Sequence, residues 1–372
     1  MTPSPTPMAS VVVVNYNGRE HLAECLTALC ADEAITPYEI LVVDNASTDD
    51  SAAMADEYAA RCPFIQSLRS PINRGYAGGL NFALPHAKGE YIAVLNPDVV
   101  VTPGWLTHLT QFLETHPNVG AVNPLILLYD GDEERINAAG QALHITGLGF
   151  NRWLGQPRAR AGHRPTRVTG IQGSAFVIRR ATLDAMGGWD ESGFLYQEDI
   201  ELSWLLQTMG YDLYCLPEVI VRHKYHLTMY PEKLFLLERN RLAMLAANLK
   251  KRTLILLSPL LALTEFMMWS YCLVRGPDFV RAKIACASRP ANSVSSPSAA
   301  APTSSCCAAS VGAMRGISSP RWAVSAANRN ANRQAACPSK SARRGAACYA
   351  PPSVNASPNH IPCAMSPSSS ST

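Results

Sequence analysis

Two groups of polar residues stand at the ends of short apolar runs, and their side chains suit the binding of nucleotides and metals. Asp44 follows the run EILVV. A carboxylate at this place could accept a hydrogen bond from a base or a ribose hydroxyl, and could equally cap a helix. Asn96-Pro97-Asp98 follows YIAVL. A divalent cation bound to a diphosphate needs one or two carboxylates and open positions, which suits Asp98, although N-P-D is also ordinary turn chemistry.

Two further groups lie in the second half of the chain. Glu198-Asp199 begins a helical pattern, where adjacent carboxylates either cap the helix or supply a general base that reaches an incoming hydroxyl. Trp189, just upstream, could stack against a sugar or belong to the core. His223 follows the run LPEVIV. A lone histidine is more often structural, but its basic companions Arg222, Lys224 and His226 could face a diphosphate.

The residues between these groups alternate between strand and helix patterns. Continuous β-branched runs predict buried strands at Ser10–Asn15, Glu39–Val43, Phe64–Leu68 and Tyr91–Leu95. Helical spacing predicts helices at Arg19–Cys30, Ser51–Ala60 and Tyr76–Ala87. This alternation indicates βαβ units and a mostly parallel sheet flanked by helices, in which ligands bind beyond the carboxyl ends of the strands. Three polar clusters are therefore expected at one sheet edge: Asn15/Tyr16, Asp44/Asn45 and Asn96/Asp98.

The second half of the chain is less regular. Residues 130–170 are rich in Gly, Arg and polar residues and are predicted to form a long loop. A strand is predicted at 171–178, a helix at Asp199–Met209 and a strand at Tyr214–Val221. Residues 253–274 are nearly all apolar, a length that suits a bilayer span, with Pro259 and Glu265 as interruptions. A span or re-entrant insertion and a buried or interfacial helix pair both stay open.

Charge divides the chain at about residue 285. Residues 285–372 contain eight Lys or Arg and no Asp or Glu, whereas the first 284 residues carry 24 Lys+Arg against 29 Asp+Glu. The mildly acidic body argues against a nucleic-acid partner. The tail, rich in Ala, Ser and Pro, cannot bury enough apolar surface to fold. We expect residues 285–372 to be disordered, and their abrupt change of composition suggests a frameshifted reading as a hypothesis.

Seven segments together resemble family 2 glycosyltransferases, and most closely the rhamnosyltransferase-type branch. They are VVVVNYNG, EILVVDNASTDDS, NRGYAGGLNFAL, GEYIAVLNPDVVV, QGSAFVIRR, GGWDESGFLYQEDIELSW and VRHKYH, in the order that the family has. The resemblance implies a GT-A domain, Rossmann-like, at residues 9–230. A C-terminal helical, membrane-associated segment at 231–284 would follow, and then the tail at 285–372.

The resemblance also implies roles for single residues. Donor binding falls to Asn15, Tyr16, Asp44, Asn45, Arg74, Gly75 and Asn96. Asp98 stands in the family's metal-binding D-x-D, and His223 can complete a Mg²⁺ or Mn²⁺ site. Asp199 matches the catalytic base, with Glu198 beside it, and Gly173 and Trp189 are expected to contact the acceptor. Two departures matter: Asn96 replaces the first Asp of D-x-D, and Leu205 stands where the family often has Arg.

The resemblance implies an inverting glycosyltransferase. The donor would be dTDP-rhamnose or a UDP-sugar, and the acceptor a cell-surface glycan or a lipid-linked glycan. A cytosolic donor would place the catalytic domain at the cytoplasmic face of the cell membrane. Two alternatives stay open: a sugar nucleotidyltransferase, although the first loop NYNGREH lacks the usual Gly-rich phosphate loop, and an inactive or scaffold homologue.

Overall fold

A computed structural model describes residues 7–32, 38–129, 133–225 and 228–288. They all belong to one compact unit. The expectations for the tail lie almost wholly outside the described residues, as does His226, and stay predictions. No prediction covers residues 99–129, where the structure has two strands and a helix.

The first half of the chain forms the parallel part of a ten-stranded sheet. Its strands lie in the order β4-β1-β2-β3, all parallel. The predicted strands and helices are confirmed, with ends that shift by a few residues at most. The elements are β1 (Ala9–Asn15), α1 (Arg19–Cys30), β2 (Tyr38–Asp44), α2 (Ser51–Arg61), β3 (Ile65–Arg69), α3 (Gly75–Ala83) and β4 (Tyr91–Leu95).

The second half extends the same sheet beyond β4 in mixed directions. The strand order continues β4-β11-β6-β12-β10, with β11 antiparallel to both neighbours and β12 parallel to β6. The elements are β5 (Val99–Val101), α4 (Trp105–Thr115), β6 (Val119–Leu128), β10 (Thr166–Val168), β11 (Ala175–Arg179), α5 (Arg180–Met186), the 3₁₀ helix η2 (Glu191–Gly193), α6 (Glu198–Thr208) and β12 (Asp212–His223).

The prediction of a loop over residues 130–170 is wrong. This stretch holds β7 (Ile136–Ala138), β8 (Gln141–Leu143), β9 (Gly149–Asn151), the 3₁₀ helix η1 (Arg158–Ala161) and β10. Strand β7 pairs with β6, and β8 and β9 pair with each other in a hairpin. Strands of three residues are too short to show an alternating pattern, so they exist because of the partners that they pair with.

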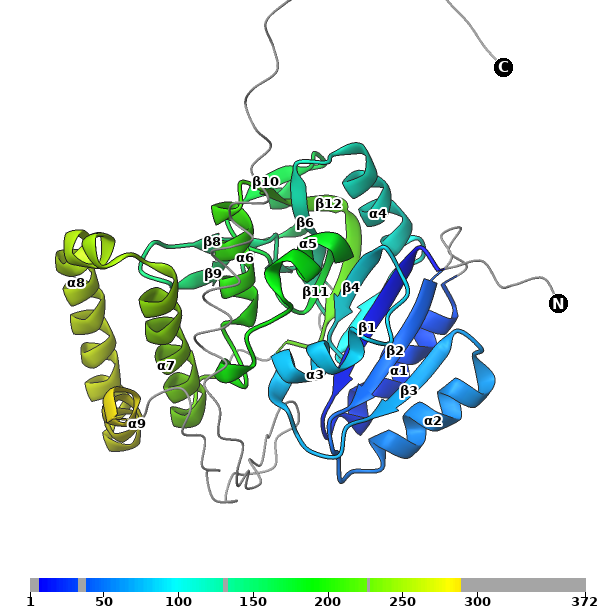
Figure 1. Ribbon diagram of the computed structural model, residues 1–372, viewed down its shortest axis with the longest axis horizontal. Helices are drawn as coiled ribbons and strands as arrows, with labels where there is room; N and C mark the ends of the chain where they lie inside the picture. Colours follow the sequence, from blue (N-terminus) through cyan, green and yellow to red (C-terminus); the bar gives the residue numbers. More distant parts are fainter. Residues whose placement is uncertain (1–6, 33–37, 130–132, 226–227, 289–372) are drawn as a thin grey trace, which may run out of the picture. The chain divides into compact units, whose positions relative to one another are not determined.

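The sheet is covered on both faces, as Figure 1 shows for the helices around the central strands. Strand β1 shows why its sequence is apolar without a break: Val11 and Val13 belong to one core and Val12 and Val14 to the other. Helices α1, α2 and α4 supply side chains to the first core, and α3, α5 and α6 to the second. The carboxyl ends of β1, β2 and β4 are thereby held in fixed register.

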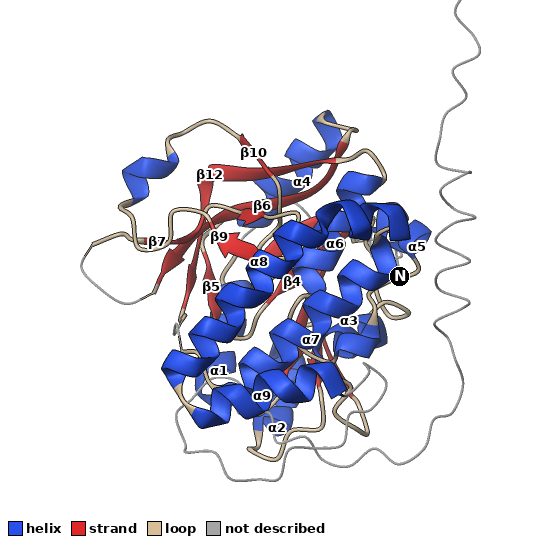
Figure 2. Ribbon diagram, turned by 90° about the vertical axis from the view of Figure 1, so that its left-hand side faces the viewer, coloured by secondary structure: helices blue, strands red, loops and turns tan. Residues whose placement is uncertain are grey.

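Three helices follow the sheet: α7 (Pro231–Asn248), α8 (Lys251–Arg275) and α9 (Pro277–Ser288). Figure 2 shows them packed side by side. Helix α7 begins where we expect the membrane-associated segment to begin, and this division into domains stays a prediction. Among the described residues, α8 is the one helix long and apolar enough to cross a membrane. Length and composition alone are weak evidence that it does so.

Candidate active site

The ends of β1 and β2 place Asn15 beside Asp44. The two residues are paired in register, and both are nearly fully buried. Asp44 Oδ2 accepts a hydrogen bond from the Ser47 N–H at 3.2 Å, whereas Oδ1 is buried and has no partner among the described residues. The residue at the N-cap of α2 is Asp50, so Asp44 does not cap that helix. A buried carboxylate oxygen without a partner is costly, and this favours a ligand contact for Asp44.

Asn45 ties the end of β2 to the start of α3. Its Nδ2 donates to the Gly75 carbonyl at 2.9 Å, and its Oδ1 accepts from the Arg74 N–H at 2.9 Å. Gly75 has φ +72°, and a Cβ there would lie 2.0 Å from the Phe194 carbonyl oxygen, so this position requires glycine. The Arg74 Nε donates to Ser70 Oγ at 3.1 Å. Donor contacts of Asn45, Arg74 and Gly75 stay predictions.

Asp98, which follows β4, and His223, at the end of β12, lie next to each other. The distance from His223 Nε2 to Asp98 Oδ1 is 3.3 Å, and the side chains are 6% and 14% exposed respectively. Strand β5 brings them together because it pairs with the end of β12, with His223 opposite Val99. On its other side the His223 ring lies 2.9 Å from Asn137 Oδ1 through Nδ1. With the Asn137 oxygen as acceptor, Nδ1 of His223 donates to it, and Nε2 faces Asp98.

This arrangement fits a divalent cation. Asp98 Oδ1 is buried and, His223 apart, accepts no hydrogen bond from the described residues, and a cation placed between it and the facing Nε2 would contact both groups. Burial raises the pKa of Asp98, but the interaction with His223 outweighs it, so the net pKa lies below the usual value and the carboxylate is charged. Within the described ranges no group of three or more His, Cys, Asp or Glu is placed to hold a metal. Asp98 and His223 would therefore leave positions for other ligands.

Asp199 is held at the start of α6 by donors from three segments. Its Oδ2 accepts from the Gly173 N–H and from Gln141 Nε2, each at 3.0 Å, and Oδ1 accepts from the Ile200 N–H at 2.8 Å. Burial raises the pKa of Asp199, although these donors favour the charged form and oppose the rise. Burial and the charge of Asp199 together raise the pKa of Glu198 to about 8. A carboxyl with a pKa of about 8 is mostly protonated at neutral pH, so Glu198 is mainly uncharged there.

Tyr76 joins the metal side of the site to Asp199. Its hydroxyl lies 2.6 Å from Asn96 Oδ1 and 3.4 Å from the Gly173 carbonyl oxygen. The Asn96 N–H donates to the Ser174 carbonyl at 2.8 Å. Because the Gly173 N–H donates a hydrogen bond to Asp199, a continuous set of contacts links the end of β4 to the start of α6. A Cβ on Gly173 would lie 3.1 Å from the Asp199 Cβ, so this position is close-packed.

A pocket opens beside this network, between η2, α6, α7 and the start of α3. Its walls include Ala77, Gly193, Glu198, Asn240 and Met244. Glu198 is the expected site residue in its wall. Trp189, for which a sugar-stacking and a core position both stayed open, is only 7% exposed and packs within the hydrophobic core. The face of its ring is therefore not accessible for stacking against a sugar. The hydrogen bonds between Asn81 and Trp189 involve the backbone N–H and carbonyl of Trp189.

The raised pKa of Glu198 predicts a pH-dependent stability. In the unfolded chain Glu198 ionises near its ordinary pKa of 4.5, and in the folded chain near 8. The folded state therefore binds more protons between these values, and Glu198 lowers the stability as the pH rises through them. Glu198→Gln removes this loss, so its Tm relative to the native chain should increase from pH 5 to pH 8. A Tm difference that stays constant over this range would contradict the prediction.

Comparisons of sequence identify relatives for the chain. A family model described as "Glycosyl transferase family 2" matches residues 10–187. The N-acetylglucosaminyl-diphospho-decaprenol L-rhamnosyltransferase of Mycobacterium tuberculosis (strain ATCC 25618 / H37Rv) is 30% identical over 249 residues, which cover 60% of this chain and 78% of the relative. The beta-monoglucosyldiacylglycerol synthase of Nostoc sp. (strain PCC 7120 / SAG 25.82 / UTEX 2576) is 28% identical over 213 residues, or 56% of this chain and 43% of the relative.

A solved structure supports the fold. The crystal structure of GalNAc-T7 with UDP, GalNAc and Mn²⁺ matches with a TM-score of 0.54 at 20% identity, and the match covers 66% of this chain and 48% of that chain. The present chain thus corresponds to about half of that structure. Together with the sheet order, this likeness establishes the GT-A type of fold that the sequence predicts.

Proposed function

Because the chain belongs to glycosyl transferase family 2, we propose that it moves a sugar from a nucleoside-diphosphate donor to a hydroxyl of a glycan or lipid-linked acceptor, with inversion at the anomeric carbon. The observation that carries the proposal is the placement of Asp199. Three donors fix its carboxylate, and the contacts through Gly173 and Tyr76 connect it to Asn96 at the end of β4. These contacts support a base and a donor site at one edge of the sheet.

In this mechanism the acceptor oxygen attacks the anomeric carbon while Asp199 takes its proton and the bond to the diphosphate breaks. A carboxylate offers about four lone-pair positions, so Asp199 keeps room for this proton besides the three hydrogen bonds that orient it. Asp98 and His223 would hold Mg²⁺ or Mn²⁺, which would stabilise the charge on the departing diphosphate. Glu198, protonated at neutral pH, spares Asp199 a second negative charge next to it.

We propose rhamnose as the sugar, with dTDP-rhamnose as the first donor to test and a UDP-sugar as the second. The support is the relation to the mycobacterial relative, whose name also contains a lipid-linked diphospho-decaprenol acceptor. The proposed location is the cytoplasmic face of the cell membrane, supported by the apolar helix α8. The test is a panel of donors with Mn²⁺, in which release of nucleoside diphosphate is measured. Release of pyrophosphate instead would identify a nucleotidyltransferase, and no release with any donor would indicate an inactive homologue.

Asp44→Ala is expected to raise the KM for the donor about 10- to 100-fold and to leave kcat nearly unchanged. The buried, unpartnered Oδ1 is suited to accept one hydrogen bond from the donor's base or ribose, and a bond to a charged group contributes about 1.5–3 kcal/mol. Steady-state kinetics over a range of donor concentrations would measure the effect. An unchanged KM with a lowered kcat would argue against a nucleotide contact of Asp44.

A further inference from the structure

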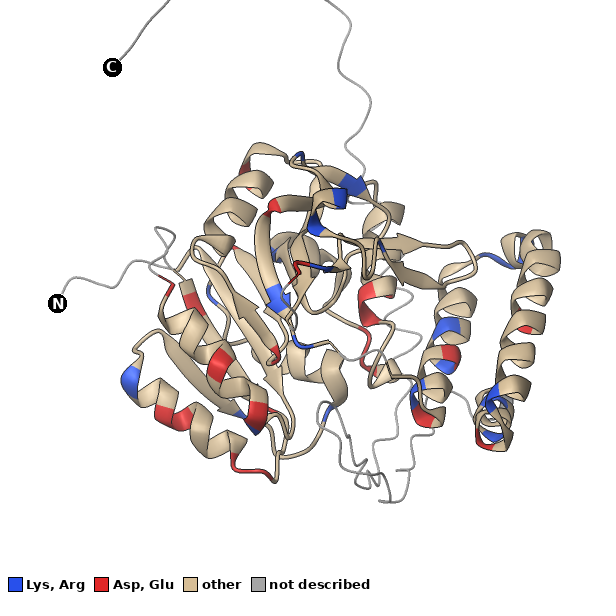
Figure 3. Ribbon diagram, turned by 180° about the vertical axis from the view of Figure 1, so that it is seen from behind, with Lys and Arg blue, Asp and Glu red and all other residues tan. Residues whose placement is uncertain are grey.

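Helix α8 presents an outer face that is apolar over its whole length. Seven of its large hydrophobic residues are 56–88% accessible: Ile255, Leu256, Leu263, Phe266, Met267, Leu273 and Val274. Figure 3 shows that α8 has almost no Lys, Arg, Asp or Glu between its ends. A continuous exposed face of this kind is rare in a protein surrounded by water and marks a surface that binds something apolar.

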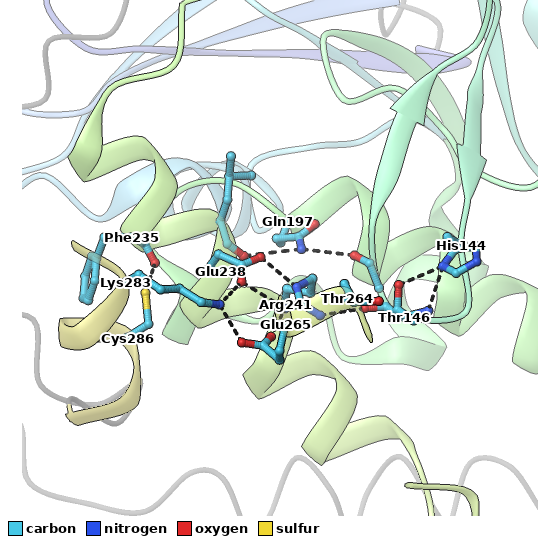
Figure 4. Close-up of polar contacts among 12 residues, drawn as sticks. His144, Thr146, Gln197, Phe235, Glu238, Arg241, Thr264, Glu265, Lys283 and Cys286 are labelled. Atoms are coloured by element: carbon cyan, nitrogen blue, oxygen red, sulfur yellow. Dashed lines mark hydrogen bonds and ion pairs between the residues drawn. The ribbon is translucent and has the colours of Figure 1, made fainter. Parts of the chain in front are cut away.

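The opposite face of α8 carries Glu265, which ties the helix to a cluster of buried charges on its neighbours (Figure 4). Glu265 pairs with Arg241 of α7 at 2.5 Å and with Lys283 of α9 at 2.8 Å. Glu238 of α7 pairs with the same two cations. The side chains of Arg241, Glu238 and Lys283 are at most 3% exposed. Breaking such a buried cluster leaves an uncompensated charge and is strongly destabilising.

The cluster also fixes these helices to the rest of the chain. Arg241 donates through Nη1 to the Thr146 carbonyl at 3.0 Å, in the turn between β8 and β9. Leu261 of α8 packs against Met244 and Leu245 of α7. Glu265 lies near the middle of α8. If α8 crossed a bilayer, the buried charges of α7 and α9 would have to enter the hydrocarbon with it, or Glu265 would lose both partners there, and either is costly.

The ends of α8 carry the charge that a bacterial membrane surface attracts. Lys250, Lys251 and Arg252 precede or begin the helix, are exposed, and form no ion pair with any described residue. Arg275 ends it. Basic residues that flank an apolar face complement anionic lipid headgroups, and each contributes about 1 kcal/mol near such a surface. An interface with a second copy of the chain would not require an uncharged face flanked by cationic residues.

We propose that α8 lies in the plane of the membrane, with its outer apolar face in the lipid and its inner face, which carries Glu265, held by α7 and α9, and does not span the bilayer. The occupant of this surface is a lipid bilayer with anionic headgroups. The proposal specifies how the chain would bind the membrane, and it rests on the proposed function only for the membrane location. Helix α7 lies between α8 and the pocket and lines that pocket with Asn240 and Met244. The membrane surface at α8 would therefore lie about one helix diameter from the pocket, within reach of an acceptor that is held in the membrane.

The first test is flotation of the purified full chain, without detergent, with vesicles of phosphatidylglycerol and phosphatidylethanolamine. We expect binding that is weaker on neutral phosphatidylcholine vesicles. The variant Leu256→Glu/Phe266→Glu, at side chains 78% and 70% exposed, should bind at least about 100-fold more weakly, and circular dichroism and Tm should match the native chain. Ile72→Glu, at an exposed apolar residue outside α8, is the matched control and should bind normally.

The second test separates an in-plane helix from a span. Lys250→Cys and Arg275→Cys are expressed separately, and inside-out membrane vesicles are treated with a membrane-impermeant maleimide. We expect each variant to gain one adduct by mass compared with the parent chain, because both ends lie on the same side. Labelling of one end alone would mean a span and would overturn the proposal. Undiminished flotation of the double variant would also overturn the proposal. So would a native chain that does not bind vesicles and instead forms a dimer through α8. Neither test uses a sugar donor, so its outcome is independent of donor turnover.

Discussion

Asp199→Asn is expected to lower turnover about 10²- to 10⁴-fold and to leave donor binding intact. The amide keeps the size of the side chain and can still accept hydrogen bonds through one oxygen, but it cannot take the proton of the acceptor hydroxyl. General-base assistance is worth about this factor in rate. The measurement is release of nucleoside diphosphate in the presence of acceptor, with donor affinity measured separately by calorimetry.

The matched control for this variant is Asp212→Asn. Asp212 begins β12 and pairs with Arg167 at the surface, so the same chemical change there should leave turnover within about twofold, as is usual for surface substitutions. If Asp199→Asn turned over at nearly the native rate, the assignment of Asp199 as the base would be wrong. If donor affinity fell together with the rate, the residue would serve the shape of the site and not proton transfer.

Asp98→Ala should abolish most Mn²⁺ binding and lower kcat about 10²- to 10³-fold. Asp98 is the one carboxylate that contacts His223, and its Oδ1 has no other partner among the described residues. Loss of several kcal/mol of charge stabilisation corresponds to a rate effect of this size. Titration of free Mn²⁺ by electron paramagnetic resonance, with nucleoside diphosphate present and no acceptor, measures the binding independently of activity.

Asp56→Ala is a suitable control for Asp98→Ala, because Asp56 pairs with Arg69 on the surface of α2 and β3. It should bind Mn²⁺ like the native chain. Native Mn²⁺ affinity in Asp98→Ala would place the cation elsewhere. If the variant bound Mn²⁺ weakly but turned over at the native rate, the reaction would not depend on a cation at Asp98.

The parallel half of the fold is predictable because its signals are local. The β-branched run of β1 and the apolar spacing of α1 each lie within one short window of sequence, and the structure has both where they are expected. The mixed half depends on pairing at a distance. Strand β7 is an element only because it pairs with β6, and its three residues are too few to show a period.

The candidate site divides in the same way. Asp44, Asp98 and Asp199 stand out in the sequence because each follows an apolar run or begins a helix. Asn137 and Gln141, which orient His223 and Asp199, give no such signal: they lie 86 and 58 residues from the side chains that they bond. Tyr76 reads in the sequence as the first residue of a helix, and only the fold brings its hydroxyl to Asn96. Trp189 shows that an aromatic residue near a motif does not by itself identify a sugar contact.

The order of strands in the sheet has a consequence for how the chain folds. Strands β1 to β4 are consecutive in sequence and neighbours in space, within residues 9–95. They can therefore assemble once residues 9–95 have left the ribosome, before the rest of the chain is made. Strand β12 must wait for more than a hundred further residues before it reaches β5 and β6. His223 arrives with β12, so the nascent chain would possess the Asp44 half of its site well before it gains the ability to bind a cation at Asp98.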